Sequence, residues 1–135
     1  MKSGVVMALE KVFTETGKVE GFSALKVGVP TKVTFTSTVE GEATVTGQSN
    51  KKLYGNDGGS GIMVRHEDGT VDASYEGSLM TGGGRIMWHS HEKSKVGDDG
   101  KVRGLEIVTG FSQSIIMETV TEPSGDFTNT AYESK

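Results

Sequence analysis

The stretch from Thr31 to Thr46 is the feature that most constrains what this chain can fold into. Five of its odd positions carry apolar side chains, among them Val33, Phe35 and Val45, and every even position carries Thr, Lys or Glu. Alternation with a period of two over such a window predicts a β-strand with one buried face. At about 3.3 Å per residue the strand would outgrow a small domain, so we expect it to bend at Gly41, as strands do in a barrel.

Length and composition extend this expectation to the whole chain. The 135 residues fit one domain with a single core, and twenty glycines with only two prolines favour short strands and tight turns. We therefore predict an all-β protein, with residues 1–135 forming one domain. Turn signals recur often enough for about eight to ten strands in an antiparallel meander. Such a meander closes into a small β-barrel, with a β-sandwich as the alternative.

Charge and cysteine content exclude several functions. The net charge is −4 with acids and bases interspersed, so we expect neither a nucleic acid nor a membrane as partner. The absence of cysteine excludes disulfides and thiol catalysis. Glu10 and Lys11 interrupt the apolar run of "MKSGVVMALEKVF" before it reaches the usual length of a signal-peptide core. These features predict a cytoplasmic protein.

The dipeptide Asp68-Gly69 in "RHEDGTVD" predicts a β-hairpin with a two-residue type I′ turn. That turn would pair His66 with Val71 and Ile62 with Tyr75 on the apolar side of the sheet. His66 would then be the one histidine that faces the interior.

A second hairpin is predicted at "LMTGGGRIMW", with the loop at Gly82-Gly83 or over residues 81–84. In this register Trp88 lies opposite Gly77 and covers it, a known arrangement for glycine in strands. On the outer side, His89 would lie opposite Glu76, and His91 opposite Ser74.

The stretch "MWHSHE" raises the question of a metal site, since an H-x-H pair on a strand directs both imidazoles to one side. The predicted registers place His66 on the other face, which argues against a three-histidine centre. A surface site at Glu76, His89 and His91 stays open as an alternative. We favour solvated histidines beside acids, and so no metal.

Two glycine runs, "NDGGSG" and "TGGGR", lack the strand and helix context of phosphate-binding loops, so we interpret both as hairpin loops and predict no cofactor. No serine lies in a hydrolase motif, and no catalytic residue is assigned. Residues 4–13 and 18–29 are predicted strands, and Leu105, Ile107 and Phe111 alternate along another. Five residues share the predicted inward face and are candidates to line a ligand-binding lumen, with plain core as the alternative: His66, Tyr75, Trp88, Phe35 and Phe111.

Three stretches carry a resemblance to a known group. "KVRGLEIVTGFSQSIIMET", "VTFTSTVEGEATV" and "HEDGTVDASYEG" resemble segments of the allene oxide cyclase-like barrels. The resemblance implies a small β-barrel, commonly oligomeric, with a mostly apolar lumen. That group includes cofactor-free cyclases and isomerases as well as members of unknown activity. No active-site residue carries over.

The leading expectation is a barrel that encloses an apolar small molecule, with enzymatic activity left open. A cofactor-free isomerase or cyclase would use His66 and Tyr75 to steady developing charge. The alternative is a non-enzymatic, homo-oligomeric binding or protein-interaction module, with Met63, Met80 and Met87 exposed on the outer side.

Overall fold

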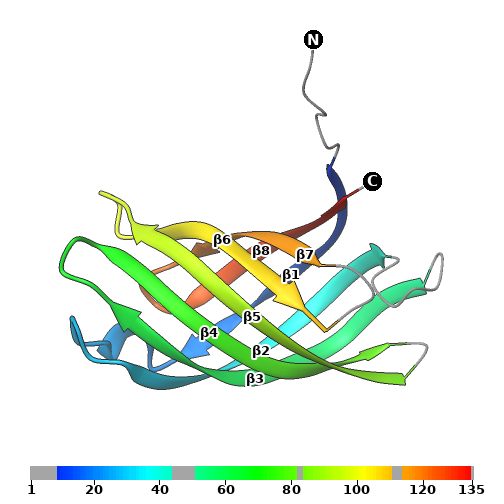
Figure 1. Ribbon diagram of the computed structural model, residues 1–135, viewed down its shortest axis with the longest axis horizontal. Coiled ribbons are helices and arrows are strands. Elements are labelled where there is room, and N and C mark those ends of the chain that lie inside the picture. Colours follow the sequence, from blue (N-terminus) through cyan, green and yellow to red (C-terminus); the bar gives the residue numbers. More distant parts are fainter. Residues whose placement is uncertain (1–8, 44–50, 82–83, 111–113, 135) are drawn as a thin grey trace, which may run out of the picture.

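A computed structural model describes residues 9–43, 51–81, 84–110 and 114–134. Its strands follow one another around a closed antiparallel barrel, and β1 completes the circle against β8 (Figure 1). In the described parts of the chain, no helix is long and apolar enough to cross a membrane. The elements are β1 (Leu9–Glu20), the 3₁₀ turn η1 (Phe22–Ala24), β2 (Thr31–Ala43), β3 (Lys51–Arg65), β4 (Thr70–Thr81), β5 (Gly84–Val96), β6 (Val102–Thr109), β7 (Ile115–Thr121) and β8 (Asp126–Ser134).

The barrel confirms the predicted all-β meander, in the closed form rather than as a sandwich. In β2, buried and exposed positions alternate as predicted, with Val33, Phe35 and Val39 on the buried face. The predicted continuation of this strand to residue 46 lies partly outside the described residues.

The N-terminal strands were predicted with wrong boundaries. Among the described residues, one strand, β1, covers residues 9–20 in place of the predicted strands over 4–13 and 18–29, and a 3₁₀ turn follows it; residues 4–8 lie outside the described residues. The register between β1 and β8 shifts between Lys11 and Phe13. This bulge lets two successive residues, Val12 and Phe13, both be buried.

The hairpin between β3 and β4 differs from the prediction by one residue. Its loop is Glu67 to Gly69: the Gly69 N–H donates to His66 O, the His66 N–H donates to Thr70 O, and Gly69 has φ 87°. This is a three-residue loop with a left-handed glycine. An Asp-Gly pair is compatible with such a loop as well as with a two-residue type I′ turn. The Asp68 carboxylate accepts bonds from the Thr70 N–H and hydroxyl at 2.9 and 2.6 Å, which stabilises this turn.

A slip of one residue exchanges the two faces of a strand. Met63 is therefore buried at 2% exposure, contrary to its predicted outer position, and Ile62 is half exposed. The inward position predicted for His66 is also wrong. Its Nε2 lies 2.8 Å from Asp72 Oδ2, on the outside of the barrel, and both side chains are well exposed.

Large inward aromatic residues each lie over a glycine of the neighbouring strand. An added Cβ at Gly61 would fall 2.6 Å from the Tyr75 ring, and at Gly77 it would fall 2.7 Å from Trp88. The glycines thus make room for rings that fill the narrow interior. The cross-strand pairs are Phe35 with Gly59, Tyr75 with Gly61, Trp88 with Gly77 and Phe127 with Gly17.

This packing also corrects the interpretation of "NDGGSG". The run lies inside β3, where two of its glycines, Gly59 and Gly61, lie beneath Phe35 and Tyr75, so it is not a hairpin loop. The other run, "TGGGR", does join two strands, since β4 ends at Thr81 and β5 begins at Gly84.

Strand β6 faces the opposite way from the prediction. Leu105 and Ile107 are 53% and 52% exposed, whereas Glu106 and Val108 are buried. The predicted alternation is present, but the polar residue is the one that points inward. Phe111, the predicted lumen residue of this segment, lies outside the described residues.

Candidate ligand-binding lumen

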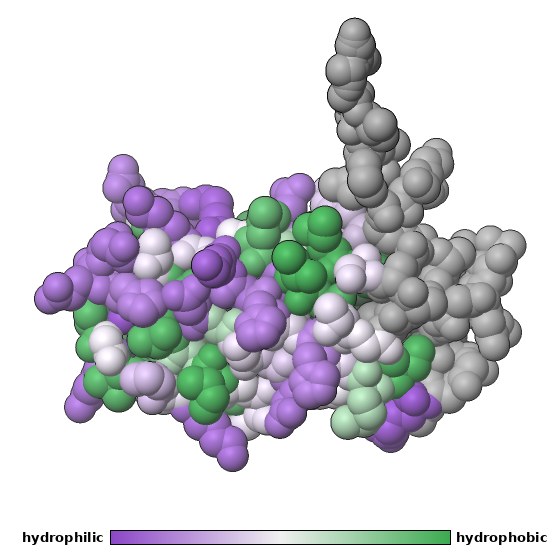
Figure 2. Space-filling model, in the orientation of Figure 1, coloured by the Kyte–Doolittle hydropathy of each residue, from purple (hydrophilic) through white to green (hydrophobic). Residues whose placement is uncertain are grey.

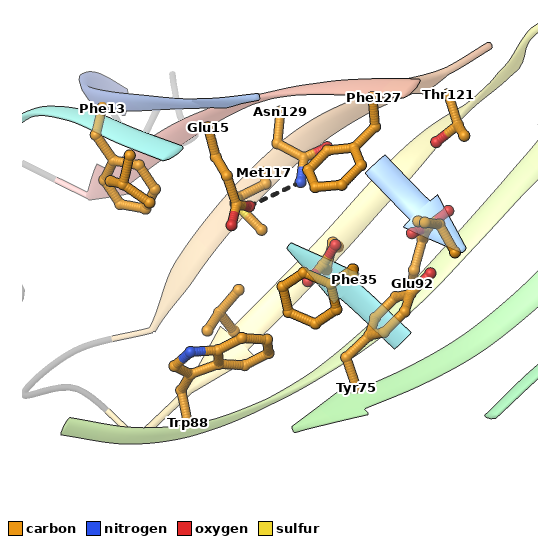
Figure 3. A pocket seen from close by; sticks show the side chains of 14 residues that line it. Phe13, Glu15, Phe35, Tyr75, Trp88, Glu92, Met117, Thr121, Phe127 and Asn129 are labelled. Carbon is orange, nitrogen blue, oxygen red and sulfur yellow. Dashed lines mark hydrogen bonds between the residues drawn. The ribbon is translucent and has the colours of Figure 1, made fainter. Parts of the chain in front are cut away.

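The interior of the barrel has an aromatic part centred on Phe35. The Phe35 ring lies 5.7 Å from the centroids of Tyr75 and Trp88 and 6.4 Å from that of Phe127. Figure 3 shows Phe35 between Trp88 and Tyr75. The side chains around the cavity are those of Phe13, Glu15, Val19, Phe35, Val39, Tyr75, Trp88, Glu92, Glu106, Val108, Met117, Thr121, Phe127 and Asn129.

Glu15 forms the first polar group of the lumen. The Ser37 hydroxyl donates to one of its carboxylate oxygens at 2.6 Å, and the Asn129 amide donates to the other at 3.0 Å (Figure 3). These three buried residues come from β1, β2 and β8, so the group joins the strands where the barrel closes. Burial raises the pKa of Glu15 above its ordinary value of 4.5, against the two hydrogen bonds, which lower it.

Glu92 forms the second polar group, on the inner face of β5. Trp88, Ser90, Glu92 and Ser94 follow one another at alternate positions, and all are buried. The Ser94 hydroxyl donates to Glu92 at 2.7 Å, while the Ser90 hydroxyl has no hydrogen-bond partner among the described residues. Burial raises the pKa of Glu92 above 4.5, and the bond from Ser94 lowers it.

Tyr75 lies within the electrostatic field of three buried carboxyl groups. Burial raises the pKa of its phenol well above 10, and the charges of Glu92, Glu106 and Glu15 raise it further. Tyr75 therefore stays a neutral hydroxyl that can donate a hydrogen bond.

Acidic side chains line the lumen, and no Lys, Arg or His is among the described residues that line it. Glu15, Glu92 and Glu106 are buried, whereas each Lys, Arg and His whose burial the structure describes is exposed or only partly buried. Carboxylates in such surroundings are costly when ionised, which is why burial favours their neutral form.

The free space inside the barrel is small. It amounts to about 50 Å³, and one water molecule needs about 10–15 Å³ on this measure. Drug-sized ligands use pockets of about 300–1,000 Å³. With the side chains as they stand, the lumen has room for a molecule of only a few non-hydrogen atoms.

Three of the five predicted lumen residues face the interior: Tyr75, Trp88 and Phe35. Their role in ligand binding stays a prediction. The sequence reasoning missed Glu15, Glu92 and Glu106. The signal for Glu92 was present, because it lies four residues after Trp88 and shares its parity on the strand.

The other histidines lie on the outer face, as predicted. The β4–β5 pairs are the predicted ones, with His89 opposite Glu76 and His91 opposite Ser74. His89 Nδ1 lies 4.0 Å from Glu76 Oε2, and His91 Nδ1 lies 2.9 Å from the Ser74 hydroxyl. Over the described ranges, no set of three or more His, Cys, Asp and Glu side chains could hold a metal ion.

Comparison with known proteins adds a likeness in fold. No protein-family model matches the chain, and no curated protein matches it. A solved structure of a protein with unknown function from Clostridium acetobutylicum is similar, with a TM-score of 0.65 and 16% identity over 96% of this chain and 100% of that chain. This likeness concerns the fold alone, and the resemblance to allene oxide cyclase-like barrels stays a prediction.

Proposed function

We propose that this barrel binds a small molecule in its lumen. The observation that carries the proposal is the meeting of an aromatic wall with buried acidic and hydroxyl groups around a residual space. Binding sites for small molecules are commonly apolar cavities with a few placed polar groups. The apolar part of the ligand would contact Phe35 and Trp88, and its polar part would reach Glu92 and Tyr75.

Native mass spectrometry of the full chain tests this proposal for a ligand of any identity. We expect a co-purifying molecule of few non-hydrogen atoms, which is lost on denaturation. Trp88 is the only tryptophan, so its fluorescence reports directly on the lumen. The proposal fails if no small molecule co-purifies and if no added compound of suitable size changes the Trp88 emission.

Catalysis by the same site is a second candidate. A buried carboxyl with raised pKa can serve as a general acid, as Glu92 would beside Tyr75. The small space favours proton-transfer isomerisation of a short substrate over cyclisation of a long flexible one. Deuterium uptake from D₂O into the co-purifying molecule, abolished by Glu92→Gln, is the expected result. Equal uptake in the Glu92→Gln protein would contradict this role.

The outer face of β6 supports self-association, the alternative expected from the sequence. Leu105 and Ile107 are about half exposed, and Ile107 pairs with Ile116, which pairs with Tyr132. Figure 2 shows hydrophobic side chains gathered where β6 and β7 lie. A second copy of the chain would cover this surface. Of the three methionines predicted to be exposed, Met87 is 65% exposed and Met63 is in the core, and the side chain of Met80 is not among those that the structure describes.

Light scattering after size exclusion tests this association. We expect an oligomer that Ile107→Glu dissociates. Ile62→Glu is the matched control, since Ile62 is also half exposed but lies on β3. A monomer at all protein concentrations would overturn the idea. A cytoplasmic location stays part of the proposal because Glu10 and Lys11 interrupt the first apolar run, and the interspersed charges argue against membrane or nucleic-acid partners.

A further inference from the structure

We propose that the ligand of the lumen is a small organic cation, a protonated primary amine on a short apolar body. This inference rests on the proposed binding function and names the class of ligand. It stands on the inner face of β5, where three different kinds of cation-binding group follow one another, and on the balance of charge around them.

The groups are Trp88, Ser90 and Glu92, at alternate positions of one strand. The Trp88 ring offers a π-face, which attracts cations. The Glu92 carboxylate offers a charged acceptor beyond the bond that it receives from Ser94. Trp88 and Glu92 both line the free space.

The Ser90 hydroxyl is the observation that points to a missing partner. It is 2% exposed and has no hydrogen-bond partner within the described ranges. Strand alternation turns it inward between Trp88 and Glu92, with Tyr75 as its cross-strand neighbour on β4, although Ser90 does not itself line the free space. A buried hydroxyl without a partner costs free energy. An ammonium group at Glu92 would reach its oxygen, and remove that cost, only after the side chains around Ser90 shift.

The charge balance selects a cation over a neutral or anionic ligand. Glu15 and Glu92 line the free space together with Tyr75, and no Lys, Arg or His is among the described residues that line it. An anion would meet like charges in a medium of low dielectric constant. An ammonium group would favour the ionised form of Glu92 and form a charge-assisted hydrogen bond with it.

Size sets the other property of the ligand. The free space of about 50 Å³ matches an amine with about three to five non-hydrogen atoms. Isobutylamine is a suitable probe, and isobutanol is its neutral counterpart of nearly equal shape. Calorimetry at neutral pH and Trp88 fluorescence would measure the binding of both probes to the full chain.

We expect the amine to bind roughly 10- to 100-fold more tightly than the alcohol, the range for a hydrogen bond to a charged group. Glu92→Gln should remove this preference, so that the amine and the alcohol bind with nearly equal affinity. Ser90→Ala should weaken amine binding by a smaller factor. Glu118→Gln is the matched control, because Glu118 lies exposed on the outer face of β7.

The outcomes separate the two proposals. If the alcohol binds as tightly as the amine and both change the Trp88 emission, the cation inference fails and the binding function stands. If Glu118→Gln lowers the amine preference as much as Glu92→Gln, general surface charge explains it and the inference also fails. If neither probe binds, the cation inference fails, and the proposed function fails with it only if no small molecule co-purifies and no other compound changes the Trp88 emission.

Discussion

Glu15 and Glu92 are both buried carboxyl groups of the same lumen, but their surroundings differ. Glu15 accepts hydrogen bonds from Ser37 and Asn129, which belong to two other strands. Glu92 accepts a bond from Ser94 on its own strand, and next to it lies a hydroxyl without a partner among the described residues. The difference teaches that Glu15 belongs to the structural closure of the barrel, whereas the surroundings of Glu92 suit a further group.

Removing a hydrogen-bond donor from each carboxyl group should give the largest difference in stability between the Glu15 and Glu92 sites. Asn129→Ala takes a donor from a buried carboxyl group and should lower the free energy of unfolding by about 2–4 kcal/mol. Ser94→Ala, at Glu92, should cost about 1 kcal/mol, since Ser94 and Glu92 lie on the same strand. Urea unfolding at neutral pH measures both. Equal losses would break the distinction between the two groups.

The pH dependence of stability should follow Glu92. Burial raises its folded-state pKa above 4.5, so the folded chain holds this proton more firmly than the unfolded chain. The free energy of unfolding should therefore fall as the pH rises from 4.5 through the raised value. Glu15, with its own raised pKa, acts in the same direction, and Glu106 and Tyr75 are the other titratable groups nearby.

Glu92→Gln should reduce this fall and stabilise the ligand-free protein at neutral pH by about 1 kcal/mol, because an amide has no charge to desolvate. Glu15→Gln should not stabilise, since it replaces one of two accepting oxygens by a donor. Urea unfolding between pH 4 and pH 8 would compare the two variants with the wild type. A Glu92→Gln protein with an unchanged pH profile would contradict the assignment.

The two serines beside these carboxyl groups offer a smaller contrast. Ser90→Ala removes a hydroxyl to which the described residues offer no partner, and it should change the stability of the ligand-free barrel by less than about 0.5 kcal/mol. Ser37→Ala should cost about 1–2 kcal/mol, because its hydroxyl bonds to Glu15. Thermal unfolding of both variants measures the contrast. A large loss at Ser90 would mean that its hydroxyl has a structural partner.

The smallest effect is expected outside the lumen. His66 and Asp72 form an exposed pair, so His66→Ala should change stability by about 0.5 kcal/mol or less. It should also leave ligand binding unchanged, in contrast to Glu92→Gln. A loss of ligand binding in the His66→Ala protein would contradict the outer position of His66 and support the inward position that the sequence pattern predicts.

The fold was predictable because alternation and turn signals repeat along the chain. The register of β3 was not, since Asp68-Gly69 fits both a two-residue and a three-residue loop. The positions of the glycines predict the correct register. If Tyr75 is placed opposite Gly61, in the way that Trp88 is placed opposite Gly77, the observed register follows. One face of each ring then lies over a neighbour without a side chain.

The candidate site was harder to predict, because its key groups break the usual rule of burial. In β6, hydrophobicity alone predicts that Leu105 and Ile107 face inward and Glu106 outward. The structure shows the reverse. Glu92 could have been placed from the parity of Trp88, but a glutamate inside a small barrel costs free energy to bury. Such exceptions are where function tends to lie.

The most direct test of the lumen as a cation site is a carbon-13 NMR titration of the side-chain carboxyl groups, with and without isobutylamine. Without the amine, the pKa values of Glu15 and Glu92 should both lie above 4.5. With the amine bound, the pKa of Glu92 should fall while that of Glu15 stays where it was. A Glu92 pKa that does not move when the amine is bound would contradict the cation site at β5.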